Sequence, residues 1–581
     1  MQNKNNKNKG MVSRFLLAYV VRQKRIAALA LLLMLCTALA RMAPPYILKV
    51  AIDTYIAQRD FWGLSVMAVL YLSFIGFEYV ALYFQIYTTQ LFGQRVIKEM
   101  RLATFSHILG LPVPYFDRTP QGKTLNYLTS DMENINEFIT SGIVTTCADL
   151  ITIVGILAVM LYLSPPLTGV VFLFFSLLFL VALLFRKRFS AAYRDNRESI
   201  SEMNAFLQES LSGIYVSKAF HRSKTDAAKF DEKNRRYTEA FRKVIFYLSL
   251  YFPLVESVGT LSLLAILWAS GEILLYGGVT FGIIVAFIEY SQKLYNPIRD
   301  LSEKFNLYQN ALSSLEKLHA LHEQEEEHHP GSKTNVAGDI EFRDVWLSYE
   351  QDDVYALKQV NLKIREGERI GIVGLTGSGK TSLINLLLGF YKPTKGEIFI
   401  GGRPMDEYAI ESIRRAFGIV AQDVFIFPRS IRENLFLHEE ASVPESLAAV
   451  QTFFEEGLRK GIGEDGVNLS EGEKQLVSIG RVLAYRPRYL ILDEATSRID
   501  PYLEARIKES LQRDFSSTTW IIIAHNLAAM AEMDRVVVIH DGRLAEQGTH
   551  TQLLAAGGIY SHLYSINMSR KGYETLHSET R

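Results

Sequence analysis

The chain has 581 residues, enough for two or more domains of ordinary size. Its 62 basic residues balance its 62 acidic residues, so no charge excess points to nucleic acid as a partner, and a hydrophobic content of 49% excludes a disordered chain. The two cysteines, Cys36 and Cys147, lie in apolar runs, which excludes a disulfide framework and a cysteine-built zinc site.

The N-terminal half contains apolar stretches that are long enough to cross a bilayer, which takes about 20 residues of helix. The clearest, at residues 167–185, carries no charge, and the weakest follows the Gly277-Gly278 break. In chain order the predicted spans are residues 26–50, 61–92, 143–163, 167–185, 246–276 and 281–295. Six spans place both termini on the same side of the membrane.

Basic residues identify that side. Lysine and arginine are frequent before residue 26 and in the long connections 93–140 and 186–243. The short connections near residues 53–60, 164–166 and 277–280 hold Arg59 as their only basic residue, so they are predicted to face outward. We therefore expect a multi-pass protein of the cell (inner) membrane, with both termini and the C-terminal domain in the cytoplasm.

The long connections keep the spacing of helices. In residues 94–109 apolar side chains recur at intervals of three or four, so membrane helices are predicted to continue into the cytosol. The predicted transmembrane domain covers residues 1–322, and a linker covers residues 323–338. Histidines in the acidic run 323–329 raise the alternative of a metal-binding tract, but a solvated hinge is the favoured interpretation.

From about residue 339 strands alternate with helices, which predicts an α/β domain over residues 339–567, followed by a polar tail at 568–581. A buried strand leads into G-x-x-x-x-G-K-T and an apolar helix, the strand–loop–helix context of a P-loop. Lys380 is expected to reach the β- and γ-phosphates, and the Thr381 hydroxyl to bind Mg²⁺. The residues expected to bind ATP here are Gly374, Thr376, Gly377, Ser378, Gly379, Lys380, Thr381 and Ser382.

Two further predicted strands end in candidate catalytic residues. After strand 489–492, the carboxylate of Asp493 suits Mg²⁺, and Glu494 could polarise a water aligned with the γ-phosphate. Without a P-loop, this acidic pair would equally indicate a helix N-terminus. A third strand, 520–524, ends in His525, which could contact the γ-phosphate and the attacking water; the alternative is a structural histidine.

These residues resemble those of the ATP-binding cassette (ABC) exporters, in the half-transporter arrangement with the membrane part first. The resemblance implies an α-helical six-span transmembrane domain followed by an α/β P-loop ATPase domain. Further matching motifs in the cassette are Gln422 (the Q-loop), residues 431–434, residues 463–466, the signature at 469–475 and the D-loop at 497–500. In the membrane part, residues 115–122 and 209–220 are similar to the family's first and second cytosolic elbows.

The resemblance implies ATP and Mg²⁺ as cofactors and a mechanism built on two cassettes. The cassettes would close head to tail, with each ATP between one subunit's P-loop and the other's signature residues Ser470, Glu471, Gly472 and Glu473. Closure would tip the membrane helices from inward-open to outward-open. Gln422 would be a Mg²⁺ ligand and a catalytic residue beside Glu494 and His525. Tyr349 would stack on adenine, or alternatively be an inward aromatic side chain of its strand.

The signature departs from the family's Leu-Ser-Gly-Gly-Gln, because Glu471 and Glu473 stand at its third and fifth positions. Two like charges about 4 Å apart repel by about 4 kcal/mol at an effective dielectric of about 20, so a carboxylate here opposes an opposite γ-phosphate. The other nucleotide-site residues are intact. This combination predicts a heterodimer, in which a second half-transporter supplies the intact signature; a homodimer is the alternative.

Ionisable residues within the spans bear on the cargo, because such residues are costly in a membrane. The candidates are Arg41, Glu78, Asp149, Glu256 and Glu289. The excess of acids favours a cavity for cationic amphiphiles; the alternative is that Arg41 pairs with one acid and the others lie at the membrane interface or cap helices. The predicted function is ATP-driven export of amphipathic drugs or lipids through the lipid bilayer, with an ATP-gated regulatory or channel-like subunit as the alternative.

Overall fold

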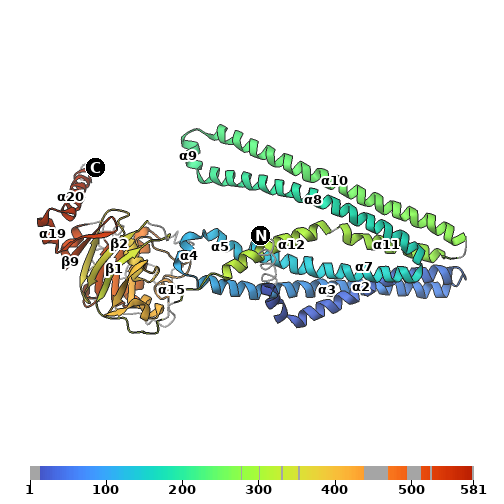
Figure 1. The fold of residues 1–581 in the computed structure, drawn as a ribbon, viewed down its shortest axis with the longest axis horizontal. Helices are drawn as coiled ribbons and strands as arrows, with labels where there is room; N and C mark the ends of the chain where they lie inside the picture. Colours follow the sequence, from blue (N-terminus) through green and yellow to red (C-terminus); the bar gives the residue numbers. More distant parts are fainter. Residues whose placement is uncertain are drawn as a thin grey trace. The chain divides into compact units, whose positions relative to one another are not determined.

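The computed structural model describes residues 14–275, 278–299, 301–328, 331–350, 354–437, 469–493, 512–513, 515–523 and 527–578. The chain divides into two compact units. The helical unit comprises Met1–Leu109 and Gln121–Gln324, and the sheet unit comprises Gly110–Pro120 and Glu325–Arg581. Figure 1 shows the long helices of the first unit and the strands of the second.

Five stretches of the helical unit have the length and apolar composition to cross a membrane, judged on the described residues. They are Lys24–Ile56, Phe61–Leu109, Gln121–Leu163, Pro165–Ser212 and Ser223–Gly271. The sixth predicted span is also helical, as α11 (Phe281–Arg299), but it is shorter and carries Glu289, Gln292 and Lys293. Its Phe287 and Tyr290 are fully buried, which shows that α11 packs mainly against protein. A helix buried in this way needs less hydropathy than one that faces lipid.

The helices of the unit follow one another with short breaks. They are α2 (Lys24–Val50), the π-helix η1 (Ala51–Ile56), α3 (Phe61–Leu109), α5 (Gln121–Leu128), α6 (Ser130–Glu137), the π-helix η2 (Phe138–Val144), α7 (Thr145–Leu163), α8 (Pro165–Ser212), α9 (Ile214–Ala219), α10 (Ser223–Leu275), α11 and α12 (Leu301–His322). Their shared core contains Ile156, Leu167, Tyr251, Ile266 and Phe287.

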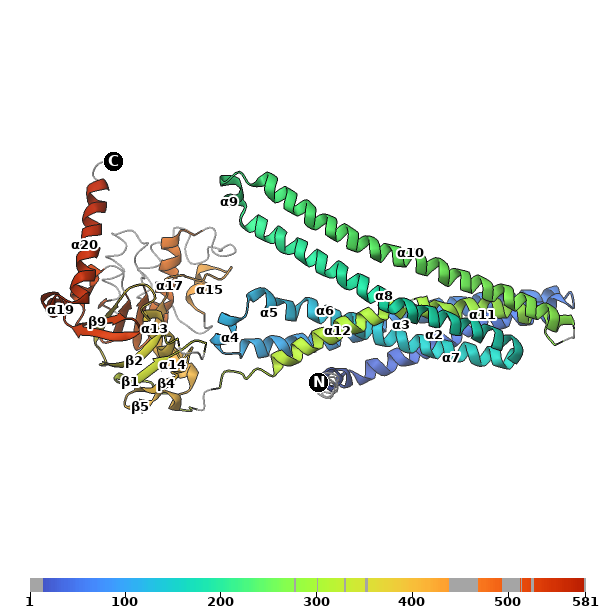
Figure 2. The ribbon, with the colours of Figure 1, turned by 45° about the horizontal axis from the view of Figure 1, so that its top comes forward.

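Three helices are much longer than a bilayer is thick. α3, α8 and α10 have 49, 48 and 53 residues, which corresponds to about 70–80 Å at 1.5 Å per residue. The hydrocarbon core is about 30 Å thick, so these helices continue well beyond it. α8 and α10 lie side by side along a hairpin whose tip is α9 (Figures 1 and 2). The expected helical extensions are therefore present.

The sheet unit contains two sheets. An antiparallel sheet has the order β2-β1-β4-β5, formed by β1 (Ile340–Leu347), β2 (Leu357–Ile364), β4 (Lys395–Ile400) and β5 (Arg403–Pro404). The second sheet has the order β10-β9-β3-β8-β7-β6. Its strands are β3 (Arg369–Val373), β6 (Phe417–Val420), β7 (Tyr489–Asp493), β8 (Thr519–Ile523), β9 (Arg535–His540) and β10 (Arg543–Gly548).

The second sheet is parallel from β9 to β6, and only β10 runs antiparallel to its neighbour. Parallel strands are buried on both faces, which explains why β3 and β7 are almost continuously apolar. The helices of this unit are α4 (Val113–Arg118), α13 (Lys380–Leu387), α14 (Ile410–Ala416), α15 (Ile431–Leu435), α17 (Glu471–Tyr485), α19 (His550–Ala556) and α20 (Ile559–Ser578), with 3-10 turns at Met405–Glu407 and Leu527–Glu532. α20 continues through most of the predicted polar tail.

The predicted linker is held to the sheet unit at several points. Glu327 accepts two hydrogen bonds from the Arg414 guanidinium, at 2.9 and 2.6 Å, and Val336 is buried. Lys333 forms a parallel bridge with Tyr408. Only part of this segment is therefore a solvated hinge, because a bidentate arginine–carboxylate pair fixes its position on the domain.

Candidate functional site

The P-loop connects β3 to α13 and forms a ring around the Lys380 side chain. The Lys380 Nζ donates hydrogen bonds to the carbonyl oxygens of Gly374 at 2.8 Å and Leu375 at 3.0 Å. The backbone N–H of Ser378 closes the loop by donating to the Leu375 oxygen at 3.1 Å. The loop therefore has the expected strand–loop–helix geometry, with a buried lysine inside it.

Two glycines of this loop are required by its geometry. A Cβ on Gly374 would lie 2.3 Å from the carbonyl oxygen of Ile539 on β9, a contact that no side chain could make. Gly379 is the N-cap of α13 with φ at +110°, and its Cβ would lie 2.8 Å from the Ala356 oxygen. Glycine is the residue that adopts this backbone conformation without strain.

One polar atom of the loop supports a bound anion. The Ser378 hydroxyl is buried and has no hydrogen-bond partner among the described residues. A buried hydroxyl without a partner costs about 1–3 kcal/mol, and a phosphate oxygen would satisfy it. It lies at the N-terminus of α13, where the helix also favours negative charge. The loop thus fits the polyphosphate of a nucleotide.

The other candidate residues follow neighbouring parallel strands. β3, β8, β7 and β6 run in the same direction, so the P-loop, Asp493 at the end of β7 and Gln422 after β6 emerge at one edge of the sheet. Asp493 is aligned with Ile523 at the end of β8. This edge brings together the exposed Thr381 hydroxyl and the Asp493 carboxylate as oxygen donors of the kind that Mg²⁺ prefers. Glu494, His525, residues 463–466 and the D-loop 497–500 lie outside the described residues.

Tyr349 lies just after β1 and is half-buried beside α13. Its hydroxyl donates to the Ser382 hydroxyl at 3.0 Å and accepts from the Asn385 amide at 3.2 Å. Its ring meets Tyr391 edge to face, with ring centroids 4.7 Å apart. These contacts hold the ring next to the first turns of the P-loop helix. They leave both the adenine-stacking role and the packing role as predictions.

The signature residues form the N-terminus of α17. Ser470 is the N-cap, and Ser470 and Glu473 form a reciprocal capping box. The Glu473 Oε2 accepts from the Ser470 N–H at 2.7 Å and from its hydroxyl at 2.9 Å, and the Ser470 hydroxyl accepts from the Glu473 N–H at 3.3 Å. The exposed Glu471 accepts a hydrogen bond from the Lys474 Nζ at 3.1 Å.

The capping box gives Glu473 a structural role that the sequence-based prediction did not include. Ser-x-x-Glu is a recognisable capping pattern, and glutamine at the last position can fill the same role. Two carboxylates nevertheless stand in the first turn of α17, Glu471 and Glu473. The helix N-terminus, which would otherwise attract an anion, is therefore already satisfied by negative charge from its own chain.

A half-buried arginine links the signature helix to the segment after the Q-loop. Arg481 of α17 donates to the Asn434 carbonyl oxygen, the Asn434 side-chain oxygen and the Phe425 carbonyl oxygen, each at 2.8 Å. Asn434 is fully buried, and its side chain also pairs with the backbone of Phe427. Burial lowers the pKa of Arg481 from its ordinary value, but the three acceptors keep the guanidinium in place. No sequence motif pointed to Arg481.

Replacing Arg481 should destabilise the sheet unit. Arg481→Met removes the donor from three oxygens, two of them on the fully buried Asn434, which we expect to cost about 3 kcal/mol. The melting temperature of this unit, followed by circular dichroism or calorimetry, should fall by about 6–12 °C. Arg415→Met, at an exposed position on α14, is the matched control and should change it little. Equal melting temperatures for the two variants would contradict the role given to Arg481.

The first cytosolic elbow belongs to the sheet unit. α4 is the short helix of Gly110–Pro120, and Asp117 accepts a hydrogen bond from the Tyr391 hydroxyl at 2.5 Å. The Arg118 guanidinium donates to the Tyr349 carbonyl oxygen. Burial and the neighbouring Asp117 carboxylate raise the pKa of Tyr391, so its hydroxyl remains a donor. α4 thus contacts both aromatic residues that flank the P-loop helix.

The ionisable residues of the spans are largely paired. Arg41 Nε lies 3.1 Å from Glu78 Oε1, and Lys304 bonds to Asp149. This agrees with the alternative in which Arg41 pairs with one acid. The excess of acids among these candidates is therefore no guide to the charge of a cavity. The predicted spans also contain Lys49 and Lys293, and Lys304, outside the spans, pairs with Asp149.

Comparisons with known proteins agree with this geometry. Residues 27–298 match the family model described as ABC transporter transmembrane region, and residues 357–497 match the one described as ABC transporter. The chain is 33% identical, over 95% of its length and 94% of the relative's, to the uncharacterized ABC transporter ATP-binding protein YfiC of Bacillus subtilis (strain 168).

Two further similarities cover nearly the whole chain. An ATP-dependent lipid A-core flippase of Thiobacillus denitrificans is 29% identical over 96% of this chain and 98% of its own length. The structure of a bacterial Atm1-family ABC exporter with ATP bound superposes with a TM-score of 0.77 at 23% identity, covering 93% of this chain and 98% of that one. That structural likeness shows the shared fold.

Proposed function

The chain belongs to the ABC exporters, with the transmembrane region and the ATPase domain in one polypeptide, and from this premise we propose that it exports amphipathic small molecules as one half of a heterodimer. ABC exporters act as dimers in a lipid bilayer, and their ATPase activity is coupled to transport. The observation that supports the proposal most is the P-loop around Lys380, with the unpartnered Ser378 hydroxyl beside it.

The roles of the site residues follow from their placement. Lys380 and the N–H groups of the P-loop would bind the β- and γ-phosphates, and Thr381, Asp493 and Gln422 would hold Mg²⁺ at the shared sheet edge. Bound Mg²⁺ would neutralise charge that develops on the phosphates. Glu494 orients and deprotonates the attacking water, with His525 beside the γ-phosphate; both roles are proposed from sequence.

A further part of the proposal concerns where the domains lie. We propose limits of 1–322 for the transmembrane domain, 323–338 for the linker, 339–567 for the cassette and 568–581 for the tail. The distribution of basic residues supports an inner-membrane protein with its termini and cassette in the cytoplasm. An impermeant thiol reagent added outside the cell should modify a cysteine introduced as Arg59→Cys. It should not modify one introduced as Lys224→Cys, which should react only from the cytoplasmic side.

The structure of the signature helix supports a heterodimer. Glu471 and Glu473 place two carboxylates where a partner's γ-phosphate would approach, so two identical chains would both have an obstructed site. A partner with an intact signature would complete this chain's P-loop. We expect the neighbouring reading frame to encode such a half-transporter, with its own catalytic glutamate replaced. Purifying the tagged chain from native membranes should recover that second chain in equal amount; recovery of this chain alone as a stable dimer would contradict the proposal.

A dimer also explains the exposed tip of the α8–α10 hairpin. Around α9, Tyr215 is 85% exposed and Phe220 is 73% exposed, and Leu211 and Val216 are largely exposed as well. Apolar side chains gathered at a helical tip mark an interaction surface. We place this second elbow against the cassette of the other subunit, so that movement of either cassette reaches both sets of membrane helices.

The hydrogen bond between Asp117 of the first elbow and Tyr391 of the cassette should transmit movement of the cassette to the membrane helices. α4 continues directly into α3 and α5, so a shift of Tyr391 relative to the membrane would pull on both helices. Tyr391→Phe removes the hydrogen bond to Asp117 but keeps the ring against Tyr349. We expect ATP affinity to be unchanged and the stimulation of ATP hydrolysis by transported compounds to fall several-fold, as for the loss of about 1 kcal/mol.

The matched control for this variant is Tyr355→Phe. Tyr355 packs on Trp346 in the same unit, away from α4. ATPase rates of both variants, measured with and without a stimulating amphiphile, separate coupling from catalysis. Full stimulation in Tyr391→Phe, or equal losses in the two variants, would show that this bond does not couple the elbow to the site.

The dependence of ATP hydrolysis on Mg²⁺ tests the proposed metal site. The purified complex in lipid should hydrolyse ATP with Mg²⁺ present, and amphipathic compounds should raise the rate. Removal of Mg²⁺ by a chelator should abolish turnover and readdition should restore it, whereas metal-independent turnover would contradict the proposed Thr381–Asp493 site. An ATPase that no amphiphile stimulates would instead favour a gating role over export.

A further inference from the structure

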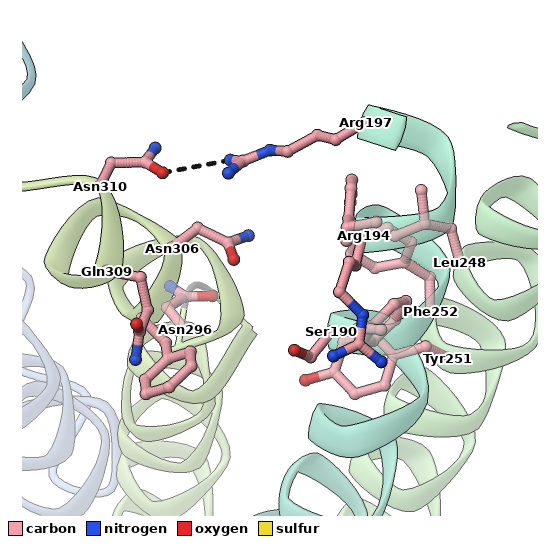
Figure 3. A pocket seen from close by; sticks show the side chains of 13 residues that line it. Ser190, Arg194, Arg197, Leu248, Tyr251, Phe252, Asn296, Asn306, Gln309 and Asn310 are labelled. Carbon is pink, nitrogen blue, oxygen red and sulfur yellow. Dashed lines mark hydrogen bonds between the residues drawn. The ribbon is translucent and has the colours of Figure 1, made fainter. Parts of the chain in front are cut away.

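A large cavity opens within the helical unit, between the α8–α10 hairpin and helices α11 and α12. Its volume is about 1200 Å³, which exceeds the size of a typical small-molecule site. One wall consists of amide side chains and the other of arginine and aromatic side chains, and the two walls face each other across the opening (Figure 3). The residues labelled in the figure are Ser190, Arg194, Arg197, Leu248, Tyr251, Phe252, Asn296, Asn306, Gln309 and Asn310.

The charge of this cavity is positive. Arg194 extends toward Ser190 and the Tyr251 hydroxyl, and Arg197 donates to the Asn310 side-chain oxygen at 3.1 Å (Figure 3). No carboxylate is among the lining residues in the described part of the chain, and neither arginine there forms an ion pair. Both guanidinium groups therefore keep an uncompensated charge.

Two acids adjoin these arginines in the sequence, and neither lines the cavity: Glu198 is exposed, and Asp195 is held by a lysine. Asp195, next to Arg194 in sequence, accepts a hydrogen bond from Lys243 of α10 at 2.9 Å. The adjoining cavity contains Glu256 together with Lys293, so it contributes one charge of each sign. Within the large cavity, the excess of positive charge thus comes from Arg194 and Arg197.

An apolar compartment continues from the same cavity. Phe179, Ala182 and Leu183 line it, and it shares Phe189 and Phe305 with the large cavity. The Arg186 guanidinium lies over the Phe305 ring, 3.8 Å from its centroid, so this arginine is engaged by an aromatic face. Polar and apolar compartments therefore adjoin along one side of α8.

The two compartments lie at different depths. Leu183 belongs to the uncharged run of α8, whereas Arg194 lies beyond its end, about 16 Å further along the helix axis at 1.5 Å per residue. A molecule that occupies both compartments would have its apolar part at the level of the lipid chains and its polar part at or below the level of the headgroups. Such an arrangement matches an amphiphile that enters from one leaflet.

From this juxtaposition we infer that the cavity binds an anionic amphiphile, a membrane lipid with a phosphate headgroup. Arginine binds phosphate through paired N–H donors, and the amides of Asn306 and Gln309 add further donors on the opposite wall. The lipid chains lie against Phe179 and Leu183. The inference rests on the proposed export function and names its substrate class, and it replaces the cationic amphiphiles that the sequence favoured.

The test is direct binding by the full-length chain in nanodiscs. The probes are fluorescent phosphatidylglycerol, phosphatidylcholine and a trimethylammonium lipid with identical chains. We expect phosphatidylglycerol to bind about tenfold more tightly than the others. The choline ammonium of phosphatidylcholine offsets its phosphate charge, and the trimethylammonium lipid presents only a cation to the two arginines. Arg194→Gln with Arg197→Gln should remove this preference, and the double Arg→Lys variant should keep part of it. Arg235→Gln, on an exposed face of α10 outside the cavity, is the control and should keep all of it.

Each outcome bears on one claim. Equal binding of the three lipids, a preference that survives the double glutamine variant, or an equal loss in Arg235→Gln would overturn the inference. If glycerol phosphate displaced the fluorescent phosphatidylglycerol at the same concentration as unlabelled phosphatidylglycerol does, the site would be assigned to a free anion. Nucleotide is absent from this assay, so a failure of the ATP-driven export proposal leaves the result intact; conversely, ATP-driven export with no anion preference would overturn only the inference.

Discussion

Lys380→Ala should abolish ATP turnover and most ATP binding. The Lys380 Nζ is buried inside the P-loop and is held by two carbonyl oxygens, so its charge is preorganised at the position of the phosphates. Each charge-assisted hydrogen bond to phosphate contributes about 1.5–3 kcal/mol, and two such bonds correspond to a loss of about 10²–10⁴-fold. Equilibrium binding of a fluorescent ATP analogue and the steady-state ATPase rate measure the two effects.

The control for this variant is Lys363→Ala. Lys363 is an exposed lysine of β2 in the same unit, paired with Asp339 at 3.0 Å. The Lys363→Ala variant should bind and hydrolyse ATP at close to the wild-type level. The melting temperature of both variants shows whether either one unfolds. A folded Lys380→Ala protein with wild-type ATP affinity would contradict the assignment of this loop to the nucleotide.

Restoring the signature should activate the chain on its own. In an assembly of identical chains, Glu471 and Glu473 meet the opposite nucleotide at both sites, and repulsion of about 4 kcal/mol per close pair slows each site. Glu471→Gly with Glu473→Gln removes both charges, and glutamine can still complete the capping box with Ser470. We expect the ATPase rate of the isolated chain to rise by about tenfold or more. Most of the gain should come from Glu471→Gly alone, because Glu473 is held by its cap.

The chain supplies a closely matched control in a second capping box. Ser430 and Glu433 at the start of α15 have the same reciprocal geometry, outside the signature. Glu433→Gln should therefore leave the ATPase rate unchanged. In the complex with a partner whose catalytic glutamate is replaced, the signature variant should also change the rate little. A brisk ATPase in the unmodified chain alone, with no gain in the variant, would contradict the asymmetric heterodimer.

Local patterns in the sequence predicted the strand–loop–helix geometry of the P-loop. The P-loop and the strand that ends in Asp493 depend on short segments, and parallel strands bring their ends to one edge. The Ser470–Glu473 capping box was also readable, since Ser-x-x-Glu is a local signal. It was overlooked because Glu473 was considered only as a charge facing a nucleotide.

Contacts between distant segments were not predictable in this way. Asp117 and Tyr391, or Arg481 and Asn434, meet only once the chain has folded, and no periodicity marks them. The charge of the large cavity also could not be predicted, and it changes the expected class of substrate. A count of charges within the spans favoured cations, but Glu78 is paired with Arg41, and Arg194 and Arg197 lie past the end of the apolar run. Pairing, rather than composition, determines the charge of an interior surface.

The weak sixth span has a similar explanation. Hydropathy measures how well a segment suits lipid, whereas α11 is covered mainly by its neighbours, with Ala286, Phe287 and Leu294 fully buried. Its polar residues face the adjoining cavity, where Gln292 and Lys293 are among the lining residues. A helix that separates a cavity from the protein core is expected to be less apolar than one exposed to lipid chains.

Vesicle transport tests the central claim most directly. A fluorescent phosphate-bearing amphiphile is added outside inverted membrane vesicles that contain the complex. The vesicles should accumulate this amphiphile when ATP and Mg²⁺ are added. Vesicles with Glu494→Gln should bind ATP but accumulate none. Accumulation that is equal in both preparations, or absent from the unmodified one despite active ATP hydrolysis, would contradict an exporter powered by this site.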